Sequence, residues 1–373
     1  MDGKFIIAQK DILSLLNAMQ PICSKKTTLD VTESIMFQVA PKELTLKSTD
    51  LQISMQSSMA IESNFLENFD FLISGKRIFD LVKEMEDDIE FNFKENQLHL
   101  KSNDVKLLLN IRSAQDFPQF PERIENLMQM ESSFLLDLLD KVAFLIPQNN
   151  SNAALNGMLL EFTNEGMLMV ATDGHRLAKI STTKYKLHEN NKWLLPKRAV
   201  LELKKILEET TVENIFLGVC GNQLVFSGIN FNFFTKLISD PFPNYEPIME
   251  REGFRAATLD KQSFLKTLKR TSCLLSGQFV STNFKFQPGK LAVNLSNKEV
   301  GKIDEALVLS NFEGEDVASR FYSPYLLSGL QVFPHDNINF FIQSDARPII
   351  FEDIDDSKNY KFTYLVMPVS AGE

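Results

Sequence analysis

One segment occurs in three versions along this chain: AQKDILSLLNAMQPICSK (8–25), ESSFLLDLLDKVAFLIPQ (131–148) and DKQSFLKTLKRTSCLLSG (260–277). Each version has large apolar residues at positions i, i+1 and i+4, a spacing that places them on one face of a helix. These residues are Ile12-Leu13-Leu16, Phe134-Leu135-Leu138 and Phe264-Leu265-Leu268. Ile12 and Phe134 are 122 residues apart, and Phe134 and Phe264 are 130 apart, so the repeats predict three similar domains.

A second helical segment lies halfway through each repeat. ISGKRIFDLVKEME (73–86) matches LLPKRAVLELKKIL (194–207), and YSPYLLSGLQVF (322–333) is a fainter third copy. The repeats therefore predict six helices, over residues 10–20, 75–86, 132–146, 196–208, 260–275 and 323–332. Between them, stretches such as 90–94 and 283–286 alternate polar and apolar residues, which is typical of antiparallel strands with one buried face.

The fold class expected from this pattern is α+β, with three similar domains that each consist of two helix-plus-antiparallel-sheet halves. Repeat spacing and the charged run EREGFR (250–255) place the domains at residues 1–126, 127–253 and 254–373. Gene duplication that produced an α+β solenoid without a particular function is the simplest alternative for the repeats alone.

Composition excludes several classes of protein. Apolar residues make up 44% of the 373, enough for a core in each domain, and the 31 phenylalanines suit sheet interiors. No apolar run reaches the roughly 18 residues of a membrane span, and the N-terminus lacks the pattern of a secretory signal. The three cysteines, Cys23, Cys220 and Cys273, are far apart and form no disulfide or metal pattern, which favours the reducing cytoplasm.

Charge is unevenly distributed along the chain. A net charge of -10 argues against nucleic-acid binding when it is considered alone. The six predicted helices nevertheless carry 13 basic residues and fewer acidic ones. For any single helix a solvated charged face is the simpler interpretation, but a bias shared by several helices favours one basic surface and an acidic remainder.

Helix geometry limits the rings that such units can build. With helices about 10 Å apart, six helices around a ring leave a hole of only about 9 Å, whereas twelve leave about 28 Å. Only the wider hole would pass a DNA duplex. A DNA-encircling ring built from this chain should therefore be a head-to-tail dimer, and it needs no base-specific motif, because phosphate contacts carry no sequence information.

The most distinctive stretch is LNGMLLEFTNEGMLMVATDGHRLAKIS (155–181). Met167 to Ala171 is expected to be a strand, Asp173-Gly174 a turn, and His175 the start of the return strand. Together with LPKRAV (195–200), FTKLISDPFPNYEPI (234–248) and YLVMP (364–368), this stretch resembles the bacterial DNA polymerase III beta subunits, the DNA sliding clamps. The resemblance covers the whole chain and is weakest over residues 278–345.

The resemblance implies the DNA clamp fold, closed into a ring as a head-to-tail homodimer. Such a ring encircles duplex DNA independently of sequence and tethers replicative and repair polymerases, conferring processivity in DNA replication. It implies a non-catalytic subunit with no cofactor and no metal. The implied partners are duplex DNA, the DNA polymerase III core, the clamp loader, and other polymerases and repair proteins that bind through short linear motifs, with no membrane involved.

Carried over position by position, the resemblance implies a partner-peptide pocket between the second and third domains. Its apolar members would accept aliphatic or aromatic anchors, and His175 and Arg176 would orient the peptide at the rim. The matching residues are Leu155, Thr172, Gly174, His175, Arg176, Leu177, Pro243, Ile248, Phe279, Tyr325, Val366, Met367, Pro368 and Val369. Without the resemblance, Leu177, Val366 and Met367 would be interpreted as ordinary core residues of strands.

Two further sets of residues follow from the resemblance. The DNA-facing residues would be Lys26, Lys197 and Arg198. The dimer interface would comprise Lys76, Arg77, Leu107 and Leu109 in the first domain and Leu274, Leu275, Glu299, Asp304 and Glu305 in the third. The chain departs from the family at Pro247, where a basic residue is common, in the Asn149–Ala154 loop, which lacks aromatic and basic residues, and in the Ser370–Glu373 extension.

Two other functions are alternatives to a DNA clamp: a hydrolase that uses Asp173 and His175, and a scaffold ring that does not bind DNA. The four histidines stand in unlike contexts, and no GxSxG, HExxH or GxxxxGK[ST] motif is present, which argues against the enzyme. Retention on circular but not on linearised DNA would distinguish the clamp from the scaffold.

Overall fold

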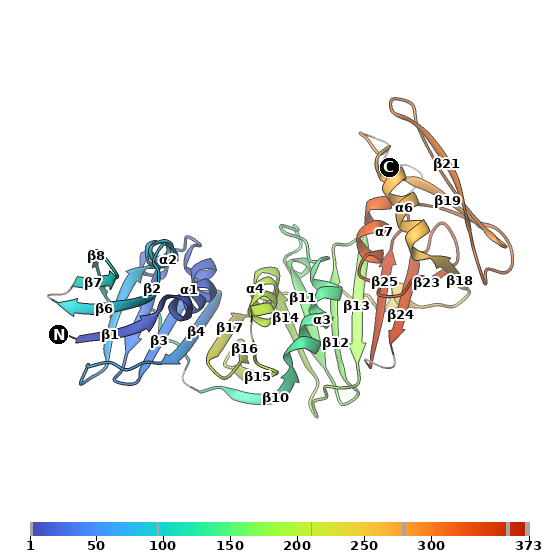
Figure 1. Cartoon of the computed structure of the whole chain (residues 1–373). Helices are drawn as coiled ribbons and strands as arrows, with labels where there is room; N and C mark the ends of the chain where they lie inside the picture. The colour runs from blue at the N-terminus through green and yellow to red at the C-terminus, as the bar shows by residue number, and fades with distance from the viewer. Residues whose placement is uncertain are drawn as a thin grey trace. The chain divides into compact units, whose positions relative to one another are not determined.

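The computed structural model describes residues 3–94, 97–121, 123–209, 211–277, 281–355 and 359–369, apart from the side chains of 354 and 355. The chain divides into two compact units, one of Met1–Phe134 with Glu202–Leu237 and the other of Leu135–Leu201 with Ile238–Glu373. Figure 1 labels most of the helices and strands of both units.

The first unit contains two antiparallel sheets and the helices α1 (Gln9–Cys23) and α2 (Gly75–Lys83), with a short 3-10 turn at Asp30–Glu33. The smaller sheet has the order β1 (Gly3–Ala8), β6 (Asp88–Lys94), β7 (Gln97–Ser102) and β8 (Val105–Asn110). The larger sheet has the order β10 (Glu125–Glu131), β15 (Asn214–Cys220), β16 (Gln223–Ser227), β17 (Phe231–Lys236), β4 (Ile53–Ala60), β3 (Glu43–Thr49), β2 (Ser34–Val39), β5 (Phe69–Ser74) and β9 (Arg112–Ser113).

Phenylalanine fills the core of the first unit, as the composition predicts. The rings of Phe5 and Phe91 stack with centroids 4.8 Å apart, and those of Phe37 and Phe71 lie 5.1 Å apart. Helix α1 packs against α2 and buries Ile12 and Leu16 completely. These two residues belong to the first copy of the repeated apolar pattern, so the pattern identified the buried face of the helix.

The second unit also contains two antiparallel sheets. The larger has the order β14 (Asn191–Pro196), β11 (Gly157–Phe162), β12 (Met167–Thr172), β13 (Arg176–Thr182), β25 (Tyr360–Val366), β24 (Ile349–Asp355), β23 (Asn337–Ile342) and β18 (Arg255–Asp260). The smaller has the order β21 (Gly301–Val308), β20 (Lys290–Asn297), β19 (Thr282–Gln287) and β22 (Val317–Phe321). The remaining elements are α3 (Ser132–Ala143), a 3-10 turn at Ala153–Asn156, α5 (Glu246–Met249), α6 (Lys261–Ser272) and α7 (Ser323–Leu330), while α4 (Lys197–Glu209) continues into the first unit.

The pairing of β13 with β25 joins segments that are far apart in the sequence. Leu177 stands opposite Leu365 and Arg176 opposite Val366, so the strand after the TDGH turn pairs directly, in antiparallel orientation, with β25 near the C-terminus. Figure 1 shows the two strands side by side within one sheet. This seam brings the two stretches that best resemble the clamp family into one place.

All six predicted helices are present, and three of them, α2, α3 and α6, end three residues earlier than expected. After each of these helices, backbone hydrogen bonds join residues that are three positions apart, as in a 3-10 turn. Met85 N–H donates to Val82 O, Leu145 N–H to Val142 O and Leu274 N–H to Thr271 O. The apolar pattern continues through such a turn, so it could not mark the end of the helix.

The described helices α1 to α4, α6 and α7 carry 13 basic residues against seven acidic ones, in line with the predicted bias. Two of the 13 do not contribute to a basic surface, because they are buried. Lys141 is 6% exposed and pairs with Asp137, and Lys261 is 8% exposed and donates to Phe333 O. Their charge serves local structure, and the predicted basic surface must come from the other helix cations.

Candidate functional site

The TDGHR turn between β12 and β13 is held by its own side chains. Thr172 Oγ1 donates to Arg176 O over 2.8 Å and accepts from Gly174 N–H over 3.1 Å. Asp173 Oδ1 accepts from the N–H groups of His175 and Arg176 at 3.0 and 3.1 Å. Gly174 has φ +94°, a conformation that glycine adopts without strain. Each residue type in the motif therefore has a structural reason, and the turn holds a fixed shape.

Arg176 connects this turn to helix α7. Its Nε donates to Asp173 Oδ2 over 2.8 Å, Nη1 donates to Ser328 Oγ, and the guanidinium lies 4.3 Å from the ring centroid of Tyr325. Burial alone would lower the pKa of Arg176, but Tyr364 and Asp173 favour the charged form and raise the pKa overall. The cation is therefore permanent, and it fixes Tyr325 beside the turn.

Two aromatic side chains complete this corner. The His175 ring lies 6.1 Å from the Tyr325 ring at an interplanar angle of 28°. Tyr364 Oη donates to Tyr325 O over 2.6 Å, and burial raises the pKa of Tyr364 to about 12, so its hydroxyl keeps the proton that it donates. A Cβ at Gly329 would collide with the Tyr364 ring, so this glycine is what allows α7 to approach β25.

Below the turn lies an apolar cluster shared by strands from both ends of the second unit. Leu177 and Leu365 are each 1% exposed, and Ile248 and Met367 pack against the cluster while remaining partly exposed. Met367 N–H donates to His175 O over 2.8 Å, which extends the β13–β25 seam beyond the end of the strand. The result is an apolar surface at Ile248 and Met367 beside a polar rim at His175 and Arg176.

The structure places most of the predicted pocket residues along this seam. Contacts join Thr172, Gly174, His175, Arg176, Leu177, Ile248, Tyr325, Val366 and Met367. Leu155 is buried in the 3-10 turn next to Ala154, a member of the apolar cluster. After Pro368, Val369 N–H donates to Arg320 O over 2.8 Å, so the chain there lies along β22. Phe279 lies outside the described residues, as does the Ser370–Glu373 extension.

A cavity of about 590 Å³ opens beside Pro243. It lies between the 238–246 segment and the strands β11 and β14. Its lining residues are Leu159, Glu161, Lys192, Trp193, Leu194, Ile238, Ser239, Asp240, Pro241, Phe242, Pro243, Asn244, Tyr245 and Glu246. Of these, only Pro243 was predicted from the sequence, although the matching DFPQFP and PFPNYEP segments pointed to a common structural element.

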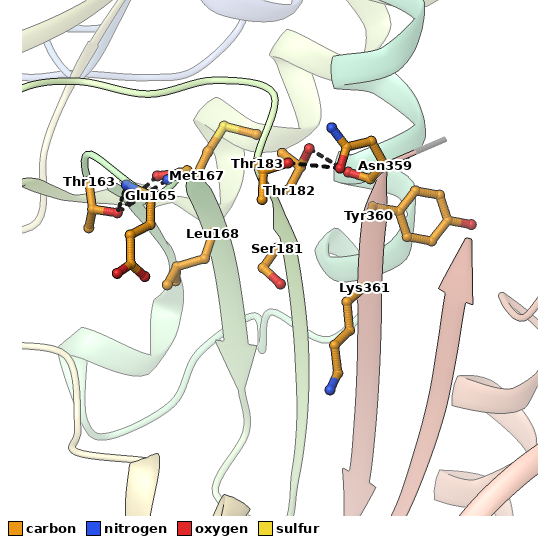
Figure 2. A pocket seen from close by; sticks show the side chains of 11 residues that line it. Thr163, Glu165, Met167, Leu168, Ser181, Thr182, Thr183, Asn359, Tyr360 and Lys361 are labelled. Carbon is orange, nitrogen blue, oxygen red and sulfur yellow. Dashed lines mark hydrogen bonds between the residues drawn. The ribbon is translucent and has the colours of Figure 1, made fainter. Parts of the chain in front are cut away.

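A second cavity, of about 350 Å³, lies at the opposite end of the β12–β13–β25 strands (Figure 2). Figure 2 shows Thr182 and Thr183 facing Asn359 across the seam, where their hydroxyls donate to its backbone and side-chain oxygens at 2.6 and 2.8 Å. Lys361 at its edge pairs with Glu352 over 2.8 Å. None of the predicted pocket residues lines this cavity.

Comparison with known proteins assigns the whole chain to one family. Models of the DNA polymerase III beta subunit match residues 3–121 with the N-terminal domain, 129–244 with the central domain and 248–370 with the C-terminal domain. The chain belongs to the DNA polymerase III beta subunit family.

Relatives and solved structures agree with this assignment. The beta sliding clamp of Pseudomonas aeruginosa is 27% identical, with 98% of this chain and 99% of the relative covered, and that of Helicobacter pylori is 26% identical, covering 98% and 100%. The crystal structure of the Bacillus subtilis DNA polymerase sliding clamp has a TM-score of 0.91 at 20% identity and covers both chains completely. A Pseudomonas aeruginosa clamp structure with a ligand has a TM-score of 0.90 at 24% identity, covering 99% and 100%. The three similar domains expected from the repeats, and the DNA clamp fold implied by the resemblance, are confirmed.

Some of the predicted dimer residues lie on the edge strands β8 and β21, and the others lie on or beside helices α2 and α6. Leu107 and Leu109 are half-buried on β8, and Lys76 and Arg77 are exposed at the start of α2. On the other unit, Glu299 and Asp304 are exposed at or before β21, and Leu274 and Leu275 are half-buried after α6. Glu305 is already engaged within the chain, because Arg270 and Thr267 donate to its carboxylate. Arg270 is the largest cause of its lowered pKa.

The predicted DNA-facing residues stand at helix ends. Lys26 is exposed shortly after α1, and Lys197 and Arg198 are half-buried in the first turn of α4. The Asn149–Ala154 loop is organised by asparagines: Asn156 Oδ1 accepts from Asn150 N–H over 2.6 Å, and Asn152 Oδ1 accepts from Ala154 N–H over 3.1 Å. These side chains shape the loop, and the loop offers no cation to a phosphate.

The site contains no arrangement typical of a metal centre. Among the described residues no group of three or more His, Cys, Asp or Glu side chains is placed to hold a metal ion. Asp173 uses both carboxylate oxygens to hold its own turn and Arg176. In the described part of the chain, no helix is both long and apolar enough to span a membrane.

Proposed function

We propose that this chain forms a head-to-tail homodimeric ring around duplex DNA and tethers polymerases to it without catalysing a reaction. The observation that supports this most strongly is the match of all three beta-subunit domains in order along the chain. The basic bias of the helices in a chain of net charge -10 agrees with a DNA-facing helical surface. Because the partners are DNA and replication proteins, we infer that the chain acts in the cytoplasm.

The dimer contact we propose pairs β8 of one copy with β21 of the next. Within the described residues, each strand is the outermost one of its four-stranded sheet, so one row of its backbone groups faces outward. Such an edge is a template for another strand. Leu108 on β8 is 53% exposed and Val308 on β21 is 79% exposed, which is apolar surface that pairing would cover. Lys76 and Arg77 on one side and Glu299 and Asp304 on the other would set the register.

The partner site we propose is the apolar surface at Ile248 and Met367 together with its rim at His175, Arg176 and Tyr325. Partly exposed apolar side chains next to a fixed polar corner suit a short peptide with aliphatic or aromatic anchors. Fully buried members of the predicted pocket, such as Leu177 and Val366, would support this surface from below. Asp173 and His175 would position the peptide and take no part in proton transfer.

Retention on DNA tests this function directly. The protein is loaded with the cognate clamp loader onto a nicked circular plasmid, and protein that remains with the DNA after gel filtration is measured. Linearisation of the same plasmid should release it, because a ring slides off an open end. Equal retention on circular and linear DNA would contradict encirclement, and no retention on either would favour a scaffold that does not bind DNA.

A further inference from the structure

The cavity beside Pro243 and the proposed peptide surface share one apolar cluster. Five of its lining residues, Leu159, Leu194, Ile238, Phe242 and Tyr245, belong to or pack against the apolar cluster that also contains Leu177 and carries Ile248 and Met367. Pro243 itself belongs both to the predicted pocket and to the lining of this cavity. A peptide anchored at Ile248 and Met367 would therefore lie over the same apolar cluster that forms part of the cavity lining.

The charged groups that line the cavity are mainly carboxylates. Glu161, Asp240 and Glu246 are acidic, and among the described residues Lys192 is the one basic member of the lining. Lys192 Nζ lies 3.1 Å from Glu161 Oε1, but its side chain is 64% exposed, so this ion pair is worth little and can be exchanged. Asp240 and Glu246 are both exposed at the cavity edge. A cationic side chain would complement this lining, whereas an anionic one would be repelled.

Aromatic side chains form part of the cavity wall. Trp193 is half-buried there, and its ring meets Phe162 edge-on at 5.8 Å. Lys179 on β13 lies 5.4 Å from the ring centroid of Tyr245, so a cation already lies near that ring, and Trp193 is a further aromatic ring of the lining. A guanidinium stacks on an aromatic face and binds a carboxylate through two parallel hydrogen bonds, so arginine suits the lining better than lysine.

We propose that the cavity is an extension of the partner site that binds an arginine side chain flanking the apolar anchors of a partner peptide. The guanidinium would replace Lys192 at Glu161, stack on Trp193 and lie between Asp240 and Glu246. This inference rests on the proposed partner site, and it adds a preference for partners whose anchors are followed or preceded by a basic residue.

Peptide binding by fluorescence anisotropy tests the inference. The probe is the labelled C-terminal peptide of the cognate polymerase, synthesised with Arg, Ala or Glu at the position before the anchors and, in a second series, after them. In one series the Arg peptide should bind about fivefold more tightly than the Ala peptide, and the Glu peptide more weakly than both. The double variant D240N/E246Q should reduce the difference between Arg and Ala, because only Glu161 then remains to bind the guanidinium, while E165Q, an exposed acid at the far cavity, should leave it unchanged.

Tryptophan fluorescence provides a second readout, because Trp193 is the only tryptophan of the chain. The Arg peptide should change its emission more than the Ala peptide does at saturation. If the Ala peptide binds but Arg gives no gain in either series and no change in emission, the inference is wrong and the proposed partner site stands. If none of the peptides binds, the partner site itself is wrong and the inference falls with it.

Discussion

Leu177 shows why burial decides which substitutions report on binding. It was predicted to line the partner pocket, and the structure places it in the apolar cluster with 1% of its surface exposed. A charged residue there would be buried without a partner, which typically costs several kcal/mol and would unfold the second unit. The informative residues are those that pack on the cluster and remain partly exposed, such as Met367.

We expect Met367→Ala to weaken binding of the labelled polymerase peptide by about tenfold, because one anchor contact is typically worth more than 1 kcal/mol. The thermal unfolding midpoint should change little, since the side chain is only partly buried. Met59→Ala, a half-buried methionine on β4 in the other unit, is the matched control and should leave binding unchanged. Unchanged affinity in Met367→Ala would place the peptide elsewhere.

Glu352 allows the pH dependence of folding stability to be tested at a single residue. The Glu352 side chain is 8% exposed, and its carboxylate is held by Arg251 and Lys361. Burial would raise the pKa of Glu352, but hydrogen bonds and charge from Arg251 and Lys361 lower it below its ordinary 4.5. A lowered pKa in the folded state means that the stabilisation is present above about pH 4.5 and is lost as the pH falls further.

Glu352→Gln should therefore lower the unfolding midpoint at pH 7, and the gap to the parent protein should narrow as the pH falls below 4.5. Thermal unfolding followed by circular dichroism from pH 7 to pH 3.5 measures this. A gap that stays constant over the whole range would show that the charge of Glu352 does not stabilise the fold.

At the scale of elements, periodic patterns were sufficient for the helices and insufficient for the sheets. The i, i+1, i+4 spacing located three of the six helices, because each must bury one apolar face, and the second repeated segment located the other three. The order of strands depends on pairings between distant segments, such as β13 with β25, for which local alternation holds no information. The proximity of these two strands could be predicted only because the stretches on both of them resemble one family. The cavity at Trp193 was missed for the same reason, since its wall comes from three separate segments.

The C-terminal segment after β25 can be tested by truncation. A chain that ends at Val366 keeps the whole of β25 but loses Met367 and the hydrogen bond from its N–H to His175 O. We expect it to lose polymerase-peptide binding while it remains folded and dimeric. A chain that ends at Val369 keeps the proposed wall and should bind. Full binding by the shorter chain would show that this segment is not part of the partner site.

For the whole molecule, the predicted domain limits at 126 and 253 remain predictions, and the dimer is the first property to measure. The parent protein should sediment as a dimer at micromolar concentration. Leu109→Asp on β8 should shift it toward monomer by at least about tenfold in the dissociation constant, because a charge would be buried at the strand edge. Leu66→Asp is the control, since Leu66 is 95% exposed in the loop before β5. A parent protein that is only monomeric would contradict the ring.

The last property of the whole molecule is how it contacts DNA. We expect binding to linear duplex to be weak, independent of sequence and steeply weakened by salt, because each phosphate contact releases counterions. Lys197→Ala and Arg198→Ala should each reduce the slope of log affinity against log salt by about one, and Lys26→Ala should do the same. Lys42→Ala, an exposed lysine in the turn before β3, should leave the slope unchanged.

The affinity is measured by anisotropy of two labelled duplexes of equal length and unrelated sequence. A clear preference for one of them would show that bases are contacted, and a slope that none of the three variants alters would show that the phosphates meet other cations of the chain.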